Sequence, residues 1–241
     1  MQAGGAFDGE RILERKPVGF PQDGGLLKPY STIFYWAHAW SDTGGMIGEH
    51  PHQGFEIMSY VLRGAIEHYD SMHKGWKRLN AGDVQIIRAG SGITHAEKIL
   101  PGAAMFQIWF DPDVSKTLSH KASYNDYPSE LFPVYKDQDS STKVILGGTP
   151  FMTESNIGDI REITFFTAFK EYPLSPGDVY SLFLIEGNMV LNGNKITTGD
   201  FALLEGESTM QLAEISAGSK VFVIRSPLDP GYNTYAGMRS I

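Results

Sequence analysis

Short runs of β-branched and aromatic residues alternate with Gly, Asn, Asp and Pro along the whole chain. Such runs are typical of β-strands, because branched and aromatic side chains pack well on a pleated sheet while the intervening residues favour turns. Amphipathic helical periodicity is scarce, and residues 122–131 are the best helix candidate. The pattern predicts an all-β sandwich or jelly roll. The predicted strands include residues 31–36, 57–62, 84–87, 106–110, 163–167, 180–185 and 221–224.

One pattern occurs twice along the chain. Residues 60–87 and 183–204 both read strand, Gly, strand, turn, Gly-Asp, strand, and the first copy has six more residues between its two glycines. A longer hairpin loop absorbs such a difference. We therefore predict two tandem β-domains, residues 1–133 and 134–241, that are joined within the polar stretch 127–142. Chance recurrence of Gly-Asp turns is the alternative for this pair alone.

A hairpin is predicted in the second copy. Asn192-Gly193 separates two short apolar runs, and this dipeptide favours the tight turn that connects two antiparallel strands.

The seven histidines all lie in the first half of the chain. Among them, His50 and His52 form one pair two residues apart, and His95 and Glu97 form another. Residues i and i+2 of a strand point to the same face, so each pair can offer two ligands to one point. Three imidazoles and one carboxylate suit a first-row divalent metal, and six-coordination leaves two positions open. A closed tetrahedral zinc site is the competing geometry. The remaining histidines are interpreted as surface or packing residues: His38, His68, His73 and His120.

The second copy of the repeat has lost most of these donors. Aligned on the glycines, Leu212 stands opposite His95 and Glu214 opposite Glu97. Pro173 and Ser175 stand opposite the His50 and His52 positions. We therefore expect a metal in the first half only.

Composition narrows the possible functions further. The chain has no cysteine, so a disulfide, a thiolate nucleophile and a Cys-bound metal are excluded. Twenty basic and 28 acidic residues give a net charge of -8, which argues against direct nucleic-acid or anionic-membrane binding. No run approaches 18 apolar residues and the start of the chain lacks the pattern of a signal peptide, so we expect a cytoplasmic protein.

Two motifs resemble those of a known family. His50-Pro-His-Gln-Gly-Phe-Glu56 is similar to the first motif of the cupins, and Ala89-Gly-Ser-Gly-Ile-Thr-His-Ala-Glu97 is similar to a variant of the second. Together with residues 82–85 and 107–109, they resemble the pirins, a family of two-domain cupins. Strong similarity covers residues 44–112, and the second half is similar in architecture only.

The resemblance implies a bicupin, which is a pair of jelly-roll domains (double-stranded β-helices), with one metal, usually iron, in the N-terminal domain. Carried over by position, the metal ligands are His50, His52, His95 and Glu97. In cupins generally the glutamate of the first motif can be a ligand, which makes Glu56 the rival carboxylate. In pirins the carboxylate comes from the second motif, and Glu56 then holds a neighbouring backbone segment or a ligand histidine.

Departures from the family pattern leave substrate and partner open, and one of them is that the glycines around residue 64 are spaced one residue longer than in the general cupin motif. Pirins commonly carry arginine where this chain has Gln53, and the family's usual C-terminal segment is hard to find in residues 227–241.

The resemblance implies an iron-dependent dioxygenase of the quercetin-cleaving type, with a small flavonol-like aromatic substrate. Glu97 or Glu56 is the candidate catalytic base that removes the substrate proton. Fe(II) is the favoured ion, although Mn, Co, Ni, Cu and Zn suit the same donors. Some apolar residues could line the substrate pocket or belong to the ordinary core: Met58, Met105, Phe106 and Trp109.

Two other functions remain open. The first is a non-enzymatic regulator that senses a metal or its redox state and binds a protein partner, as the resemblance to transcriptional-cofactor pirins implies. The second is a structural cupin without activity.

Overall fold

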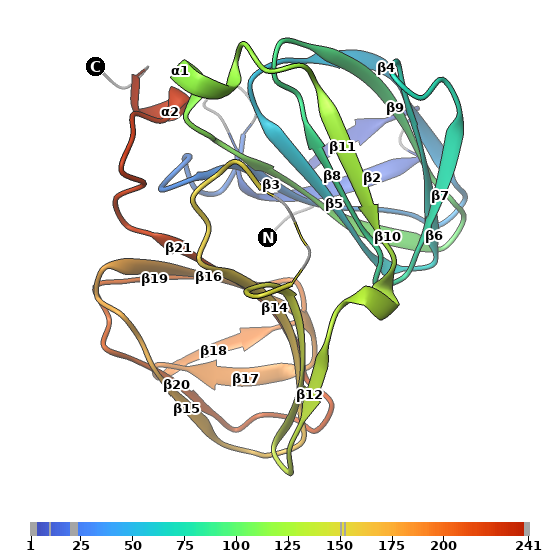
Figure 1. Cartoon of the computed structure of the whole chain (residues 1–241). Helices are drawn as coiled ribbons and strands as arrows, with labels where there is room; N and C mark the ends of the chain where they lie inside the picture. Colours follow the sequence, from blue (N-terminus) through green and yellow to red (C-terminus); the bar gives the residue numbers. More distant parts are fainter. Residues whose placement is uncertain (1–3, 10, 20–23, 150, 152, 239–241) are drawn as a thin grey trace. The chain divides into compact units, whose positions relative to one another are not determined.

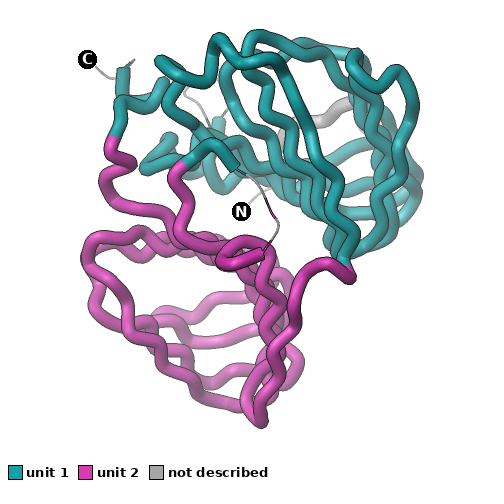
Figure 2. The backbone as a smooth tube through the Cα atoms, in the orientation of Figure 1, with its two compact units in different colours: residues 1–129, 152–155, 232–241 teal, residues 130–151, 156–231 magenta. Residues whose placement is uncertain are grey.

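The computed structural model describes residues 4–9, 11–19, 24–149, 151 and 153–238, and these form two compact units (Figure 2). Unit 1 comprises residues 1–129, 152–155 and 232–241. Unit 2 comprises residues 130–151 and 156–231. The sequence-based division after residue 133 gave each domain one continuous range and stays a prediction.

Unit 1 contains two antiparallel sheets (Figure 1). The seven-stranded sheet has the spatial order β1 (Gly4–Phe7), β2 (Ile12–Val18), β3 (Ile33–Ser41), β10 (Ala103–Phe110), β5 (Glu56–Arg63), β8 (Val84–Arg88) and β11 (Ser123–Tyr127). The four-stranded sheet has the order β4 (Gly45–His52), β9 (Ile93–Ile99), β6 (Ala65–Asp70) and β7 (Trp76–Asn80).

Unit 2 repeats this arrangement with fewer strands. Its six-stranded sheet has the order β12 (Val134–Lys136), β13 (Ser140–Leu146), β14 (Asp159–Phe165), β21 (Lys220–Pro227), β16 (Asp178–Glu186) and β19 (Phe201–Glu205). Its four-stranded sheet has the order β15 (Lys170–Pro173), β20 (Thr209–Ala213), β17 (Asn188–Leu191) and β18 (Asn194–Thr197).

Apolar side chains of the two sheets meet in the core of each unit. In unit 1, Val61 and Met105 of the larger sheet pack with Ile66 and Ile99 of the smaller sheet. In unit 2, Leu182 of the larger sheet and Leu212 of the smaller one belong to one buried cluster. Each unit is therefore a β-sandwich closed around its own core.

The repeat in the sequence corresponds to the same turn in both units. Gly82 donates its backbone N–H to Val61 O at 2.8 Å, and Gly199 donates to Leu184 O at the same distance. Both glycines have a positive φ, 88° and 87°. The aspartate that follows each glycine accepts a backbone N–H three residues earlier, at 2.7 Å for Asp83 and 2.8 Å for Asp200. Chance recurrence does not explain so close a match.

The all-β class is confirmed, and the predicted Asn-Gly hairpin joins β17 to β18. The helix predicted over residues 122–131 is wrong. Residues 123–127 form strand β11 on the edge of β8, and only Ser129–Leu131 make a 3-10 turn, η1. Pairing with β8 satisfies the backbone of this segment and thereby overrides its weak helical pattern. The two α-helices of the described residues, α1 (Val114–Thr117) and α2 (Tyr235–Met238), have four residues each. Among the same residues, no helix has the length and apolar character needed to span a membrane.

Candidate metal centre

Strands β4 and β9 bring three histidines to one point. The two strands pair antiparallel with His50 directly opposite His95, and His52 follows on the same face of β4. A bulge between Ile47 and His50 shifts the register, so that Glu97 stands opposite Ile47. The three imidazoles therefore face the same side of the four-stranded sheet, as the spacing in the sequence predicts.

The distances between the rings suit a shared ion. One ligand nitrogen from each of His50, His52 and His95 lies within 4.8 Å of the others. The Nε2 atoms of His50 and His95 are 3.0 Å apart. Two nitrogens bound to one ion at ~2.1 Å and a right angle are separated by ~3.0 Å, so this spacing fits coordination.

Neighbouring groups leave Nε2 of each ring available. Nδ1 of His50 lies 2.8 Å from the carbonyl oxygen of Gly48, and Nδ1 of His95 lies 3.2 Å from Nε2 of His68. The buried Nε2 of His52 has no hydrogen-bond partner among the described residues. An orphaned buried nitrogen beside two oriented ones is what a metal site requires of its protein ligands.

Burial keeps the rings of His52 and His95 neutral. Desolvation, followed by the neighbouring histidines, lowers the pKa of His52 to about 3 and that of His95 to about 2. A neutral imidazole is the form that binds a metal, so little proton competition is expected at neutral pH.

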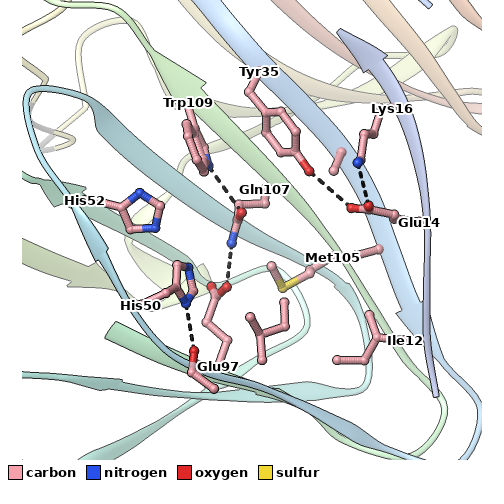
Figure 3. A pocket seen from close by; sticks show the side chains of 14 residues that line it. Ile12, Glu14, Lys16, Tyr35, His50, His52, Glu97, Met105, Gln107 and Trp109 are labelled. Atoms are coloured by element: carbon pink, nitrogen blue, oxygen red, sulfur yellow. Dashed lines mark hydrogen bonds and ion pairs between the residues drawn. The ribbon is translucent and has the colours of Figure 1, made fainter. Parts of the chain in front are cut away.

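Glu97 lies in the same cavity wall, but its carboxylate is not part of the close three-histidine group. It is 1% exposed. Gln107 donates its amide N–H to Glu97 Oε2 at 2.5 Å, and the Ser59 hydroxyl donates to Oε1 at 3.3 Å. Gln107 in turn accepts a hydrogen bond from the indole of Trp109 at 3.2 Å (Figure 3). This chain of hydrogen bonds fixes the carboxylate beside the histidines.

Glu56 is held elsewhere. Its fully buried carboxylate accepts hydrogen bonds from the backbone N–H groups of Glu154 and Ser155, at 2.8 and 2.7 Å, and from the hydroxyls of Thr153 and Ser155. Burial raises its pKa and the donors oppose that shift. Glu56 is not among the described residues that line the cavity, so the structure brings it to the segment of residues 153–155 and not to the histidines.

His68 contacts His95, and the sequence pattern did not identify it as part of the site. Its ring is 1% exposed and its Nδ1 lies 3.9 Å from Asp70 Oδ2. A signal was present, because residues 66, 68 and 70 share one face of β6, the strand that pairs with β9.

His50 and His52 line one end of a cavity with a volume of about 370 Å³ (Figure 3), and His95 is not among its lining residues. This volume lies within the usual range for ligand pockets of ~300–1,000 Å³. Of the four apolar candidates, Met105 and Trp109 line the cavity, whereas Met58 and Phe106 are fully buried core residues outside its lining. The ring of His52 packs edge-on against Trp109, with centroids 4.8 Å apart.

Unit 2 has no comparable cluster of metal-ligating side chains among its described residues. Leu212, which aligns with His95, is a fully buried core residue there.

Comparison with known proteins agrees with this description. The family model named Pirin matches residues 28–110. A protein of Zymomonas mobilis named "Putative quercetin 2,3-dioxygenase" is 36% identical over 180 residues, which are 72% of this chain and 69% of that protein. A "Pirin-like protein" of Caulobacter vibrioides is 52% identical over 115 residues, which are 46% of this chain and 45% of that one.

Solved structures share the fold. A quercetin 2,3-dioxygenase from Acinetobacter baumannii superposes with a TM-score of 0.78 at 20% identity, over 94% of this chain and 77% of that one. A bacterial pirin of Escherichia coli in complex with nickel(II) gives a TM-score of 0.74 at 21% identity, over 93% of this chain and 95% of that one. The architecture is therefore that of a bicupin. Together with the relative that is 36% identical, it shows that the chain belongs to the pirin family.

Proposed function

We propose that the chain is a metal-dependent dioxygenase for a flavonol-like aromatic substrate, with His50, His52, His95 and Glu97 as the ligands of one divalent ion. The observation that carries the proposal is the convergence of three imidazoles, two of which, those of His50 and His52, line a largely apolar cavity. Fe(II) is the ion that the family resemblance favours, although the nitrogen and oxygen donors also suit Mn, Co, Ni, Cu and Zn.

The side chains of the cavity have separate tasks in this proposal. A bound divalent ion supplies orientation and charge stabilisation for a substrate oxygen and dioxygen. Glu97 accepts the proton of the substrate hydroxyl, and Gln107 holds the carboxylate in place for that transfer. Met105 and Trp109 pack against the aromatic rings and exclude water.

The alternative is a regulator that senses metal or redox state and binds a protein partner. The cavity supports the enzyme, since a sensor needs no room for a substrate beside the ion. The regulatory role and the cytoplasmic location stay predictions.

Metal content is the first test. We expect about one divalent ion per chain by mass spectrometry in protein purified without an affinity tag, because the site is formed by a single unit. His50→Ala/His95→Ala should lose the ion. The matched control is His73→Ala/His120→Ala, which removes two exposed histidines and should retain it. Equal metal in the two double variants would refute the ligand assignment.

Oxygen uptake then separates the two candidate bases. Quercetin should stimulate uptake in the wild type, and Glu97→Gln should reduce the rate per bound metal ion at least ~100-fold through loss of the base. Glu56→Gln should lower thermal stability because its amide N–H₂ replaces one of the two oxygens that together accept from four donors, and its rate per folded molecule should stay near that of the wild type. Loss of turnover in a stably folded Glu56→Gln would transfer the role to Glu56. Metal without flavonol-dependent uptake would favour the regulator.

A further inference from the structure

The cavity has a second polar end, which lies away from the histidines. On strand β2, Ile12, Glu14 and Lys16 alternate into the cavity, and Tyr35 reaches it from β3. In Figure 3 these polar side chains lie on one side of the cavity and His50 on the other, with Met105 between them. The cavity thus has a second polar group, separated from His50 by Met105.

Glu14 is the centre of this second polar group. Its Oε2 accepts a hydrogen bond from the Tyr35 hydroxyl at 3.1 Å, and its Oε1 lies 2.8 Å from Lys16 Nζ. The side chain of Glu14 is 3% exposed and that of Lys16 is 13% exposed. The ion pair is therefore shielded from solvent in a wall whose neighbouring residues are aliphatic.

Stability does not account for an ion pair in this position. The attraction between two buried charges does not reliably offset the free energy needed to remove them from water. Apolar residues of similar volume commonly stabilise a fold equally well. The adjacent lining residues Ile12, Ala39 and Ile47 demonstrate that this wall accepts aliphatic side chains. A charged pair that faces the cavity is consequently better explained by recognition of a ligand.

The chemistry of the pair restricts what it can recognise. A carboxylate has about four acceptor positions, and Tyr35 and Lys16 each engage one oxygen of Glu14, so the group can accept a further hydrogen bond. Its negative charge disfavours an anionic substituent, and the adjacent lysine offsets the attraction for a cation. A neutral hydroxyl that donates a hydrogen bond satisfies both conditions.

We propose that Glu14, supported by Lys16 and Tyr35, binds a phenolic hydroxyl at the end of the substrate that lies away from the metal-binding oxygen. Glu14 is then a specificity-determining residue that selects an aromatic compound hydroxylated at both ends. This inference rests on the proposed function for the metal-binding end of the ligand.

Binding of four flavonols tests the proposal without turnover. The probes are 3-hydroxyflavone, galangin, kaempferol and quercetin, which share the 3-hydroxyl and carry increasing numbers of ring hydroxyls. Dissociation constants are measured anaerobically on zinc-loaded full-length protein by calorimetry. In the wild type, at least one ring-hydroxylated probe should bind about tenfold or more tightly than 3-hydroxyflavone, since it gains a hydrogen bond to a charged acceptor.

The matched variants remove one ion pair each. Glu14→Leu/Lys16→Met deletes the cavity pair without leaving an unpaired charge, and the preference should shrink to within about threefold. Glu162→Leu/Lys220→Met deletes a carboxylate–lysine pair between β14 and β21 of unit 2, and the preference should stay. If the cavity variant fails to fold, the four probes on the wild type still test whether a ring-hydroxylated flavonol binds more tightly than 3-hydroxyflavone.

Two results would overturn the inference: equal affinity for all four probes in the wild type, or an unchanged preference in the folded cavity variant. Oxygen uptake is recorded separately on iron-loaded protein. Selective binding without uptake would refute the dioxygenase proposal and leave the role of Glu14 intact. Oxygen uptake together with equal affinities for the four probes would refute the role of Glu14 and leave the dioxygenase proposal intact.

Discussion

At the scale of single residues, the contacts behind the three histidines are as informative as the histidines themselves. His68 lies behind His95 and interacts with its Nδ1, while Asp70 lies beside the other nitrogen of His68. Such contacts fix the tautomer and ring orientation of a metal-binding imidazole. His68 is therefore interpreted as a positioning residue for the proposed metal centre.

His68→Ala should weaken metal binding about tenfold to a hundredfold, because His95 loses the partner that orients it. His68→Gln, whose amide oxygen can accept from Nδ1 of His95, should recover part of the affinity. The measurement is a competition titration with Co(II), together with the visible absorption bands of the bound ion. Lower thermal stability with unchanged affinity and unchanged bands would reduce His68 to a packing residue.

A second histidine links residue chemistry to pH. Burial, helped by the charges of Arg15 and Arg63, lowers the pKa of His38 from 6.5 to about 4. The unfolded chain binds this proton at a higher pH than the folded chain does, so stability falls as pH decreases from about 6.5 to about 4.

For His38 this loss amounts to at most about 3 kcal/mol. Urea unfolding of the wild type and His38→Gln across that range measures the difference, and the variant should have the shallower dependence on pH. Parallel curves would show that His38 is protonated equally in the folded and unfolded chains.

At the scale of elements, the sandwich depends on places where the chain turns against a neighbouring strand. Gly64, between β5 and β6, has φ 70°, and a Cβ there would lie 2.9 Å from Ala103 Cα. Gly187, its counterpart in unit 2, has φ 97° and faces Ser219 just as closely. Both the conformation and the close contact require glycine, which explains why the sequence repeat retains it.

Gly64→Ala should lower the free energy of unfolding by about 2–4 kcal/mol, because it adds a steric clash to an unfavourable φ. Gly102 is the matched control, since it also has a positive φ, 76°, but a Cβ there would meet no atom of the described residues within 4 Å. Gly102→Ala should cost only about 1 kcal/mol. Equal losses in chemical denaturation would indicate that backbone conformation alone decides the cost.

At the scale of the whole molecule, unit 1 is completed by segments that are remote in the sequence. Backbone N–H groups of Tyr235 and Ala236 donate to the buried Asp111 carboxylate at 3.0 and 3.1 Å. The Tyr235 ring packs against Phe55, with centroids 5.5 Å apart, and Phe55 contacts Trp109. The C-terminal segment therefore reaches the residue that packs against Trp109, the neighbour of His52.

Deletion of residues 232–241 should loosen this side of unit 1, because the buried Asp111 carboxylate loses its donors and the aromatic cluster loses Tyr235. Amide hydrogen exchange should become faster in β3 and β10, while β17 and β18 of unit 2 serve as the internal control. Unchanged protection in β3 and β10 would mean that the segment contributes nothing to the stability of the site.

Much of the architecture was predictable because it follows from local chemistry. Branched and aromatic runs predicted the strands, and Asn192-Gly193 predicted a hairpin. Strand β2 was not predicted, because its Glu, Arg and Lys residues obscure the alternation of apolar and polar positions. Only its pairing with β3 explains why these residues form a strand. The helix predicted over residues 122–131 failed for a similar reason, because pairing with β8 decided its conformation.

By itself, the sequence determined the all-β class, the repeated Gly-Asp turn and the His-x-His and His-x-Glu pairs, because each depends on residues a few positions apart. The tertiary structure decided which strands meet. Pairing of β4 with β9 set His50 against His95, pairing of β6 with β9 added His68, and β2 supplied Glu14 to the cavity. Contacts between segments that are distant in the chain depend on the packing of the whole unit, so local patterns could not predict them.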